Sequence, residues 1–177
     1  MRNFSIGRTV TYTIYFYIID SDSSFANKLD YSLNRNPNHN IDIFQSKKEF
    51  LQQYSNQKLK VGRDIINIII IDAHQLEPEK DIQLLRKLKK KNKNTEFIVL
   101  TDGVSNKISS FALDLGVYEI IQKNDNIFYR IENSIKSVTS LYNFLKKKKS
   151  LRQIVYALII FVALSGTLFY FLVLIQN

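Results

Sequence analysis

Four polar side chains stand at or just after apolar stretches of the chain, and their types suit phosphoryl and metal chemistry. They are Asp20, Asp72, Thr101 and Lys123. Carboxylate oxygens are the ligands that a hard cation such as Mg²⁺ prefers. A lysine, a hydroxyl and a cation together stabilise the charge of a transferring phosphoryl group, and an aspartate can itself accept that group. A site of this kind requires that the four residues meet.

The elements around these residues predict that they do meet. Asp72 ends residues 67–72, whose four isoleucines suit a parallel strand buried on both faces. Further strands are predicted at residues 12–19, 40–45, 96–100 and 117–122, with a helix after each strand. Five strands alternating with five helices predict an α/β fold built on a doubly wound, five-stranded parallel sheet. The carboxyl ends of such strands share one edge of the sheet, where ligands bind.

Several helix ends can also be predicted. Ser46 and Glu49 form a capping box, and Pro78 suits the first turn of the third helix. Ser105 is expected to cap the fourth helix and Gly116 to close it. Most residues from 86 to 93 are basic, which we interpret as a solvated C-terminal end of the third helix.

Residues 12–142 resemble the receiver domain of two-component response regulators. The resemblance rests on Ile-Ile-Asp at 18–20, Ile-Ile-Ile-Asp at 69–72, Val-Leu-Thr at 99–101 and Leu-Gly-Val-Tyr-Glu-Ile-Ile-Gln-Lys at 115–123. It implies the flavodoxin-like receiver fold. It also implies that Asp72 is the phosphoacceptor, Thr101 the switch hydroxyl and Lys123 the phosphate-pairing lysine.

The same resemblance implies a Mg²⁺ pocket and shows where this chain departs from the pattern. The implied ligands are Asp20, Asp22, Asp72 and the backbone carbonyl of His74, whose side chain is expected to have no role. The two acids after the first strand are separated by a serine, where the family has adjacent acids. The Met-Pro and Asp-Gly pairs that usually follow the phosphoacceptor are missing, Asp102 follows the threonine, and Asn124 replaces a proline. These departures are typical of a receiver that has kept its fold and weakened or lost phosphorylation.

Residues 154–175 carry no charge and form an apolar stretch. As a helix they would be roughly 33 Å long, enough to cross a bilayer core of about 30 Å. Lys146–Lys149 and Arg152 precede the stretch, so the positive-inside rule predicts a cytoplasmic N-terminal part. We therefore expect a receiver-like domain at 1–145, a basic juxtamembrane segment at 146–153 and a single transmembrane helix at 154–175, in a bacterial inner membrane.

Two functions fit these predictions best. The first is a degenerate receiver that acts as an interaction subunit or adaptor of an inner-membrane complex. The second is an active response regulator phosphorylated on Asp72 by a histidine kinase. We do not expect an enzyme: Asp20-Ser21-Asp22 resembles the opening of haloacid-dehalogenase-type phosphatases, but a late acidic pair is missing.

Composition limits other classes of function. The net charge of +9 is concentrated in local runs, and a helix-turn-helix is not visible, so no nucleic-acid partner is expected. The chain has no cysteine and hence no disulfide framework or thiol chemistry.

Overall fold

A parallel five-stranded sheet forms the centre of the computed structural model, which describes residues 12–56, 59–62, 64–103 and 106–176. The strand order is β2-β1-β3-β4-β5. The strands are β1 (Thr13–Ile19), β2 (His39–Phe44), β3 (Ile65–Asp72), β4 (Thr95–Thr101) and β5 (Glu119–Gln122). The helices are α1 (Ser23–Leu33), α2 (Lys47–Asn56), the short 3₁₀ turn η1 (Ala73–Gln75), α3 (Pro78–Lys91), α4 (Asn106–Leu115) and α5 (Ile127–Gln176). The predicted fold class is confirmed.

Strand β3 is the central strand and lies between β1 and β4. Its isoleucines at positions 68–71 are at most 1% exposed. Both faces of this strand are therefore covered, as the unbroken run of β-branched residues predicts. Its last residue, Asp72, stands at the carboxyl edge of the sheet.

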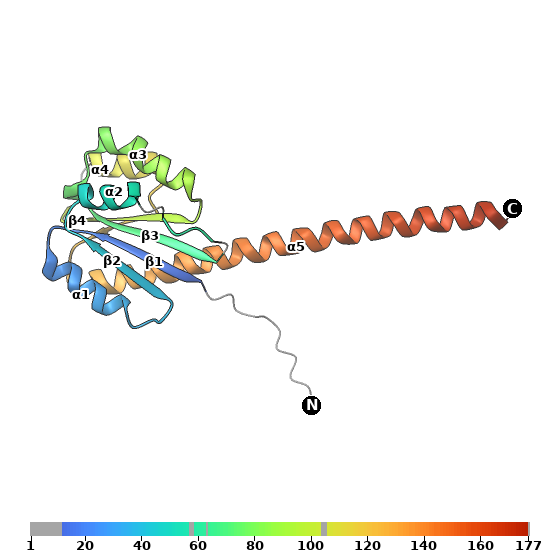
Figure 1. The fold of residues 1–177 in the computed structure, drawn as a ribbon, viewed down its shortest axis with the longest axis horizontal. Coiled ribbons are helices and arrows are strands. Elements are labelled where there is room, and N and C mark those ends of the chain that lie inside the picture. The colour runs from blue at the N-terminus through green and yellow to red at the C-terminus, as the bar shows by residue number, and fades with distance from the viewer. Residues whose placement is uncertain (1–11, 57–58, 63, 104–105, 177) are drawn as a thin grey trace, which may run out of the picture. The chain divides into compact units, whose positions relative to one another are not determined.

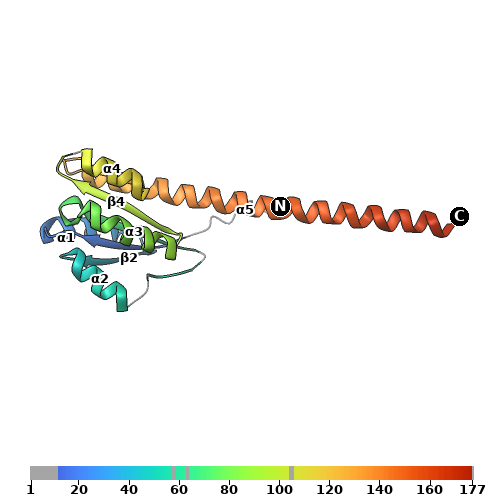
Figure 2. The ribbon, with the colours of Figure 1, turned by 90° about the horizontal axis from the view of Figure 1, so that it is seen from above.

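Two layers of helices cover the two faces of the sheet (Figure 1). Helices α2, α3 and α4 pack on one face through a core that includes Phe50, Leu85 and Phe111. Figure 2 shows these three helices spread across that face. Helix α1 and the first turns of α5 cover the other face, where Phe25 stacks on Phe128 and Ser32 bonds to Glu132.

Local sequence signals set the ends of several helices. Pro78 opens α3, and Gly116 follows α4 with φ of 65°, a conformation that glycine adopts without the Cβ penalty. At the start of α2 the Ser46 hydroxyl accepts the Glu49 backbone N–H, as the capping box predicts. The predicted cap Ser105 lies outside the described residues.

Arg86, Lys87 and Lys90 at the basic end of α3 are exposed, as its composition predicts, and two cations of this end also bond to neighbouring elements. Arg86 donates to the carbonyl of Asp114, and Lys89 bonds both to Glu96 and to the carbonyl of Gly116. These cations therefore tie α3 to the end of α4 and to β4.

Helix α5 continues without a break through residues 127–176. The chain divides into two units, Met1–Lys136 and Ser137–Asn177, and α5 contributes to both. In the second unit every described residue from Ile154 to Gly166 is exposed. By length and composition α5 is able to cross a membrane.

Candidate functional site

Three of the four predicted site residues meet at the carboxyl edge of the sheet. Asp20 follows β1, Asp72 ends β3 and Lys123 follows β5. The Nζ of Lys123 donates to Asp20 Oδ2 at 2.8 Å and also to Asp72 Oδ2. Asp20 is 1% exposed and Asp72 5% exposed, so the lysine is the cation that compensates two buried carboxylates.

The charges of the site stabilise one another. Burial raises the pKa of Asp72, but hydrogen bonds from Lys123 and His74 and the charge of Lys123 outweigh burial and hold that pKa below its usual range. Burial lowers the pKa of Lys123, and its bonds to the two aspartates reverse this effect and raise the pKa above its usual range. These shifts keep the carboxylate of Asp72 and the ammonium of Lys123 ionised at neutral pH.

The second oxygen of Asp72 is bound by the residue two positions further on. The backbone N–H of His74 donates to Asp72 Oδ1 at 2.7 Å, as the cap of the short turn η1. The ring Nδ1 of His74 lies 2.9 Å from the same oxygen, and it is 3.8 Å from Oδ2 of Asp102. The expectation that this side chain has no role omitted its contact with the predicted phosphoacceptor.

The hydroxyl of Thr101 is engaged within its own loop. Its Oγ1 donates to the carbonyl of Gly103 at 2.6 Å and accepts the Gly103 N–H at 3.2 Å. The carbonyl of Thr101 accepts the backbone N–H of Lys123 at 2.8 Å, which places the threonine beside the lysine in the sheet. Thr101 thus belongs to the same edge of the sheet, with its hydroxyl bonded to the backbone after β4.

Asp22, the second acid after β1, serves as a helix cap. Its Oδ1 accepts the N–H groups of Ser24 and Phe25 at the start of α1. Its own N–H donates to Asp20 Oδ1 at 2.8 Å, so the loop after β1 folds back on the buried carboxylate. The predicted role of Asp22 as a metal ligand stays a prediction, because its oxygen holds the helix start here.

Several solved structures that are similar to this chain are receiver domains. The response regulator receiver domain protein (CheY-like) from Methanospirillum hungatei is 21% identical, with a TM-score of 0.57, over 72% of this chain and 94% of its own. The signal receiver domain of an HD domain-containing protein from Pseudomonas fluorescens is 17% identical, with a TM-score of 0.59, over 80% of this chain and 98% of its own. The chain has the fold of a response regulator receiver domain. No protein-family model and no curated protein matches its sequence.

One similar receiver structure contains ligands. A response regulator protein from Burkholderia pseudomallei, solved with a phosphorylated aspartic acid, a calcium ion and citrate, is 20% identical to this chain. It matches 78% of this chain and 74% of its own, with a TM-score of 0.52. This likeness shows the shared receiver fold.

The carboxyl edge of the sheet offers fewer free metal ligands than the sequence suggests. Among the residues that the structure describes, no group of three or more His, Cys, Asp or Glu side chains is arranged to hold a metal ion. The two buried carboxylates, Asp20 and Asp72, are bridged by the ammonium of Lys123. Oxygen donors of the type that Mg²⁺ prefers are thus present, but each oxygen of these two carboxylates already accepts at least one donor of the protein itself. The predicted Mg²⁺ stays a prediction.

An aromatic pair borders the site and was not foreseen as part of it. The Nζ of Lys123 lies 5.0 Å from the ring centroid of Phe25, and Phe25 stacks on Phe128 with centroids 5.6 Å apart. A cation over an aromatic face is held by the ring quadrupole. The sequence has no local signal for this contact, because Phe25 and Lys123 lie far apart along the chain.

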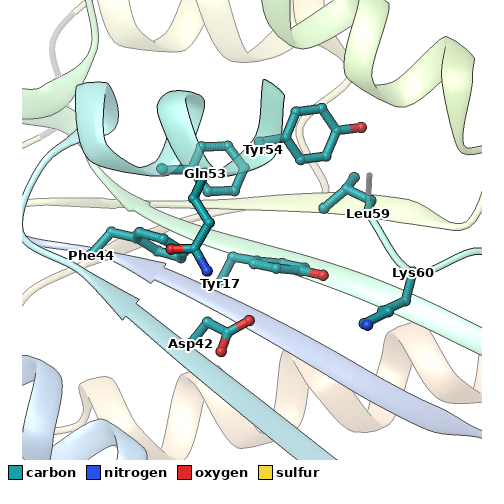
Figure 3. A pocket seen from close by; sticks show the side chains of 8 residues that line it. Tyr17, Asp42, Phe44, Gln53, Tyr54, Leu59 and Lys60 are labelled. Atoms are coloured by element: carbon teal, nitrogen blue, oxygen red, sulfur yellow. The ribbon is translucent and has the colours of Figure 1, made fainter. Parts of the chain in front are cut away.

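The structure also has a pocket on the face of the sheet that carries α2 (Figure 3). Tyr17 and Asp42 line it from β1 and β2, and Tyr54 lines it from α2. The hydroxyl of Tyr17 lies 3.4 Å from Oδ1 of buried Asn67, and burial raises the pKa of Tyr17 to about 12. The amide of Asn67 donates to the carbonyl of Lys60. These contacts anchor the segment before β3, and we assign them a structural role.

Proposed function

We propose that this chain is a receiver-like module, held at a membrane by its C-terminal helix, that acts as an interaction subunit or adaptor of a membrane complex. The observation that carries the proposal is the occupied state of Asp72. One of its carboxylate oxygens is held by Lys123 and the other by two donors of His74. A receiver whose acceptor oxygens are all engaged is better suited to present a surface than to turn over phosphoryl groups.

The membrane part of the proposal rests on α5. Its apolar stretch is long enough to span a bilayer, and its described side chains from Ile154 to Gly166 are exposed. The basic run Lys146–Lys149 lies on the N-terminal side of the stretch and favours a cytoplasmic location for the receiver-like domain in a bacterial inner membrane.

The absence of cysteine from the chain permits a clean test of this topology. Ser150→Cys and Gln176→Cys each introduce a single thiol, one on either side of the apolar stretch. In intact spheroplasts an impermeant maleimide should label the thiol at position 176 and leave the one at position 150 unlabelled until the membrane is opened. The reverse pattern would overturn the orientation, and extraction of the chain by alkaline carbonate would overturn the span.

The adaptor role is tested by cross-linking in membranes, followed by purification of the full chain in a mild detergent. The same membrane proteins should be recovered with the wild type and with Asp72→Asn, because the proposed surface does not depend on phosphorylation. Recovery that is lost in Asp72→Asn, or no cross-linked partner with either chain, would contradict the role of a phosphorylation-independent adaptor.

A second candidate function, an active phosphoacceptor, is favoured by the ion pairs of Lys123 with Asp20 and Asp72. In this reaction an oxygen of Asp72 attacks the phosphorus of a donor such as acetyl phosphate. The bond from phosphorus to the acetyl oxygen breaks and acetate leaves. The lysine would then pair with the phosphoryl oxygens. Incubation of the full chain with acetyl phosphate and Mg²⁺ should add one phosphoryl group to the wild type and none to Asp72→Asn; no gain in either would exclude this function.

A further inference from the structure

The phosphoacceptor candidate has a barrier built into its own loop. We propose that the imidazole of His74 is a lid on Asp72, which closes Oδ1 against a divalent cation and slows phosphorylation. The inference rests on the second candidate function for its phosphorylation part, while its cation part stands on the geometry of the lid alone.

The lid follows from the three donors that surround the carboxylate of Asp72. The backbone N–H of His74 is fixed by the turn η1, and the ammonium of Lys123 is fixed between two buried carboxylates. The imidazole is the third donor, with Nδ1 at 2.9 Å from Oδ1 when that nitrogen carries the proton. Its side chain is 70% exposed, so it can rotate into solvent without disturbing the sheet.

Asp102 helps to keep the ring over the site. Its Oδ2 lies 3.8 Å from the same ring nitrogen and comes from the loop after β4. The ring therefore lies beside two carboxylates, one buried and one exposed. A cation that approaches Oδ1 must displace the ring from both of them, and a hydrogen bond to an ionised carboxylate is among the stronger ones that a protein makes.

The lid gives the site two states that differ in the side-chain rotamer of His74. In the closed state Oδ1 accepts two donors and offers little to a cation. In the open state only the backbone N–H remains, and a cation can reach Oδ1 while Lys123 stays in place. A protein partner that binds over this edge and draws the ring away would open the site. The lid therefore predicts that this acidic pocket, which keeps its lysine and its acids, accepts phosphoryl groups more slowly than it would without the imidazole.

The test uses the full chain in a mild detergent, with Mn²⁺ as the probe cation. Binding is measured from the free Mn²⁺ signal in electron paramagnetic resonance. His74→Ala removes the ring and keeps the backbone N–H and carbonyl. The dissociation constant for Mn²⁺ should fall by about tenfold, the order expected when one charge-assisted hydrogen bond no longer competes. Asp125→Asn, a change of charge near Lys123 that does not touch Asp72, is the control and should stay within about twofold of the wild type.

Phosphorylation by acetyl phosphate is measured on the same variants. The rate should rise about tenfold in His74→Ala, in parallel with the gain in cation affinity, and should vanish in His74→Ala combined with Asp72→Asn. Unchanged or weaker Mn²⁺ binding in His74→Ala would overturn the lid. Tighter Mn²⁺ binding without any phosphoryl adduct would support the lid as a barrier to cations and exclude the phosphoacceptor function.

Discussion

The most direct test of the site is Lys123→Met, which removes the cation that bridges Asp20 and Asp72. Methionine keeps much of the side-chain length and leaves Asp20 and Asp72 facing one another without the ammonium. The side chains of Asp20 and Asp72 are 2% and 7% exposed, so water does not replace the ammonium as a partner of either carboxylate. Removal of one partner from a buried ion pair costs about 3 to 5 kcal/mol, and the lysine is itself 19% exposed, so we expect a loss near the lower end, about 3 kcal/mol.

Asp72→Asn is the matched control for this change. It leaves one carboxylate and one ammonium in the site, so the pair formed by Asp20 and Lys123 stays neutral. We expect a loss of less than about 1 kcal/mol, and Lys123→Met combined with Asp72→Asn should recover about 1 to 2 kcal/mol relative to Lys123→Met alone.

The assay is denaturant unfolding of the full chain at a fixed detergent concentration. Near-ultraviolet circular dichroism is a suitable signal, because the chain has ten tyrosines and no tryptophan. The slope of the unfolding free energy against denaturant concentration should be the same in every variant. A shift in the midpoint of unfolding then reports a change in stability.

The pH dependence gives the prediction a sign. The pKa of Asp72 is lowered in the folded protein, so its contribution is present above the ordinary value of 3.8 and is lost as pH falls through the folded value. The difference between wild type and Lys123→Met should therefore shrink towards pH 3. The pKa of Lys123 is raised, so its contribution is present below the ordinary value of 10.5 and is lost as pH rises through the folded one. Equal losses in Lys123→Met and Asp72→Asn, or a difference independent of pH, would refute the reasoning.

Three further changes test the scaffold. Asp81→Asn should lower the free energy of unfolding by about 2 kcal/mol, because this buried carboxylate accepts Lys47 Nζ and a backbone N–H, both at 2.7 Å; a midpoint equal to that of the wild type would contradict this. Gly116→Ala should cost about 1 kcal/mol, since φ is 65°, while Gly103→Ala, with open space around its added methyl, should cost less in the same unfolding assay. Tyr17→Phe should remove one phenol that ionises near pH 12 in an absorbance titration, and loss of one that ionises near 10 would show that Tyr17 is not buried.

The sheet was predictable because its signals are local and repeated. The run of isoleucines before Asp72 is typical of a strand buried on both faces, and such a strand lies at the centre of a parallel sheet. Helix ends with a defined local chemistry, such as Pro78 and Gly116, were also predictable. Once the strands are parallel, their carboxyl ends must share an edge, so the meeting of Asp20, Asp72 and Lys123 follows from the order of the strands.

The details of the site depend on side-chain torsions, which leave no pattern in the sequence. Whether His74 bonds to Asp72 or faces solvent depends on two rotations that cost little. Asp22 was predicted as a cation ligand, and the structure shows it as the cap of α1; aspartate suits either role, so its identity alone does not distinguish them. Phe25 lies against Lys123 because α1 and the segment after β5 are neighbours only in the folded chain.

The use of Asp22 as a cap links the loop after β1 to the stability of α1. One of its two carboxylate oxygens, Oδ1, accepts two amide N–H groups at 2.9 and 3.1 Å, and these would lose their acceptor if that oxygen turned to a cation. A cation bound through Oδ1 of Asp22 would therefore compete with the first turn of α1 for the same oxygen. Amide hydrogen exchange at Ser24 and Phe25 would thus report whether the carboxylate of Asp22 caps α1 or binds a cation, without direct observation of the ion.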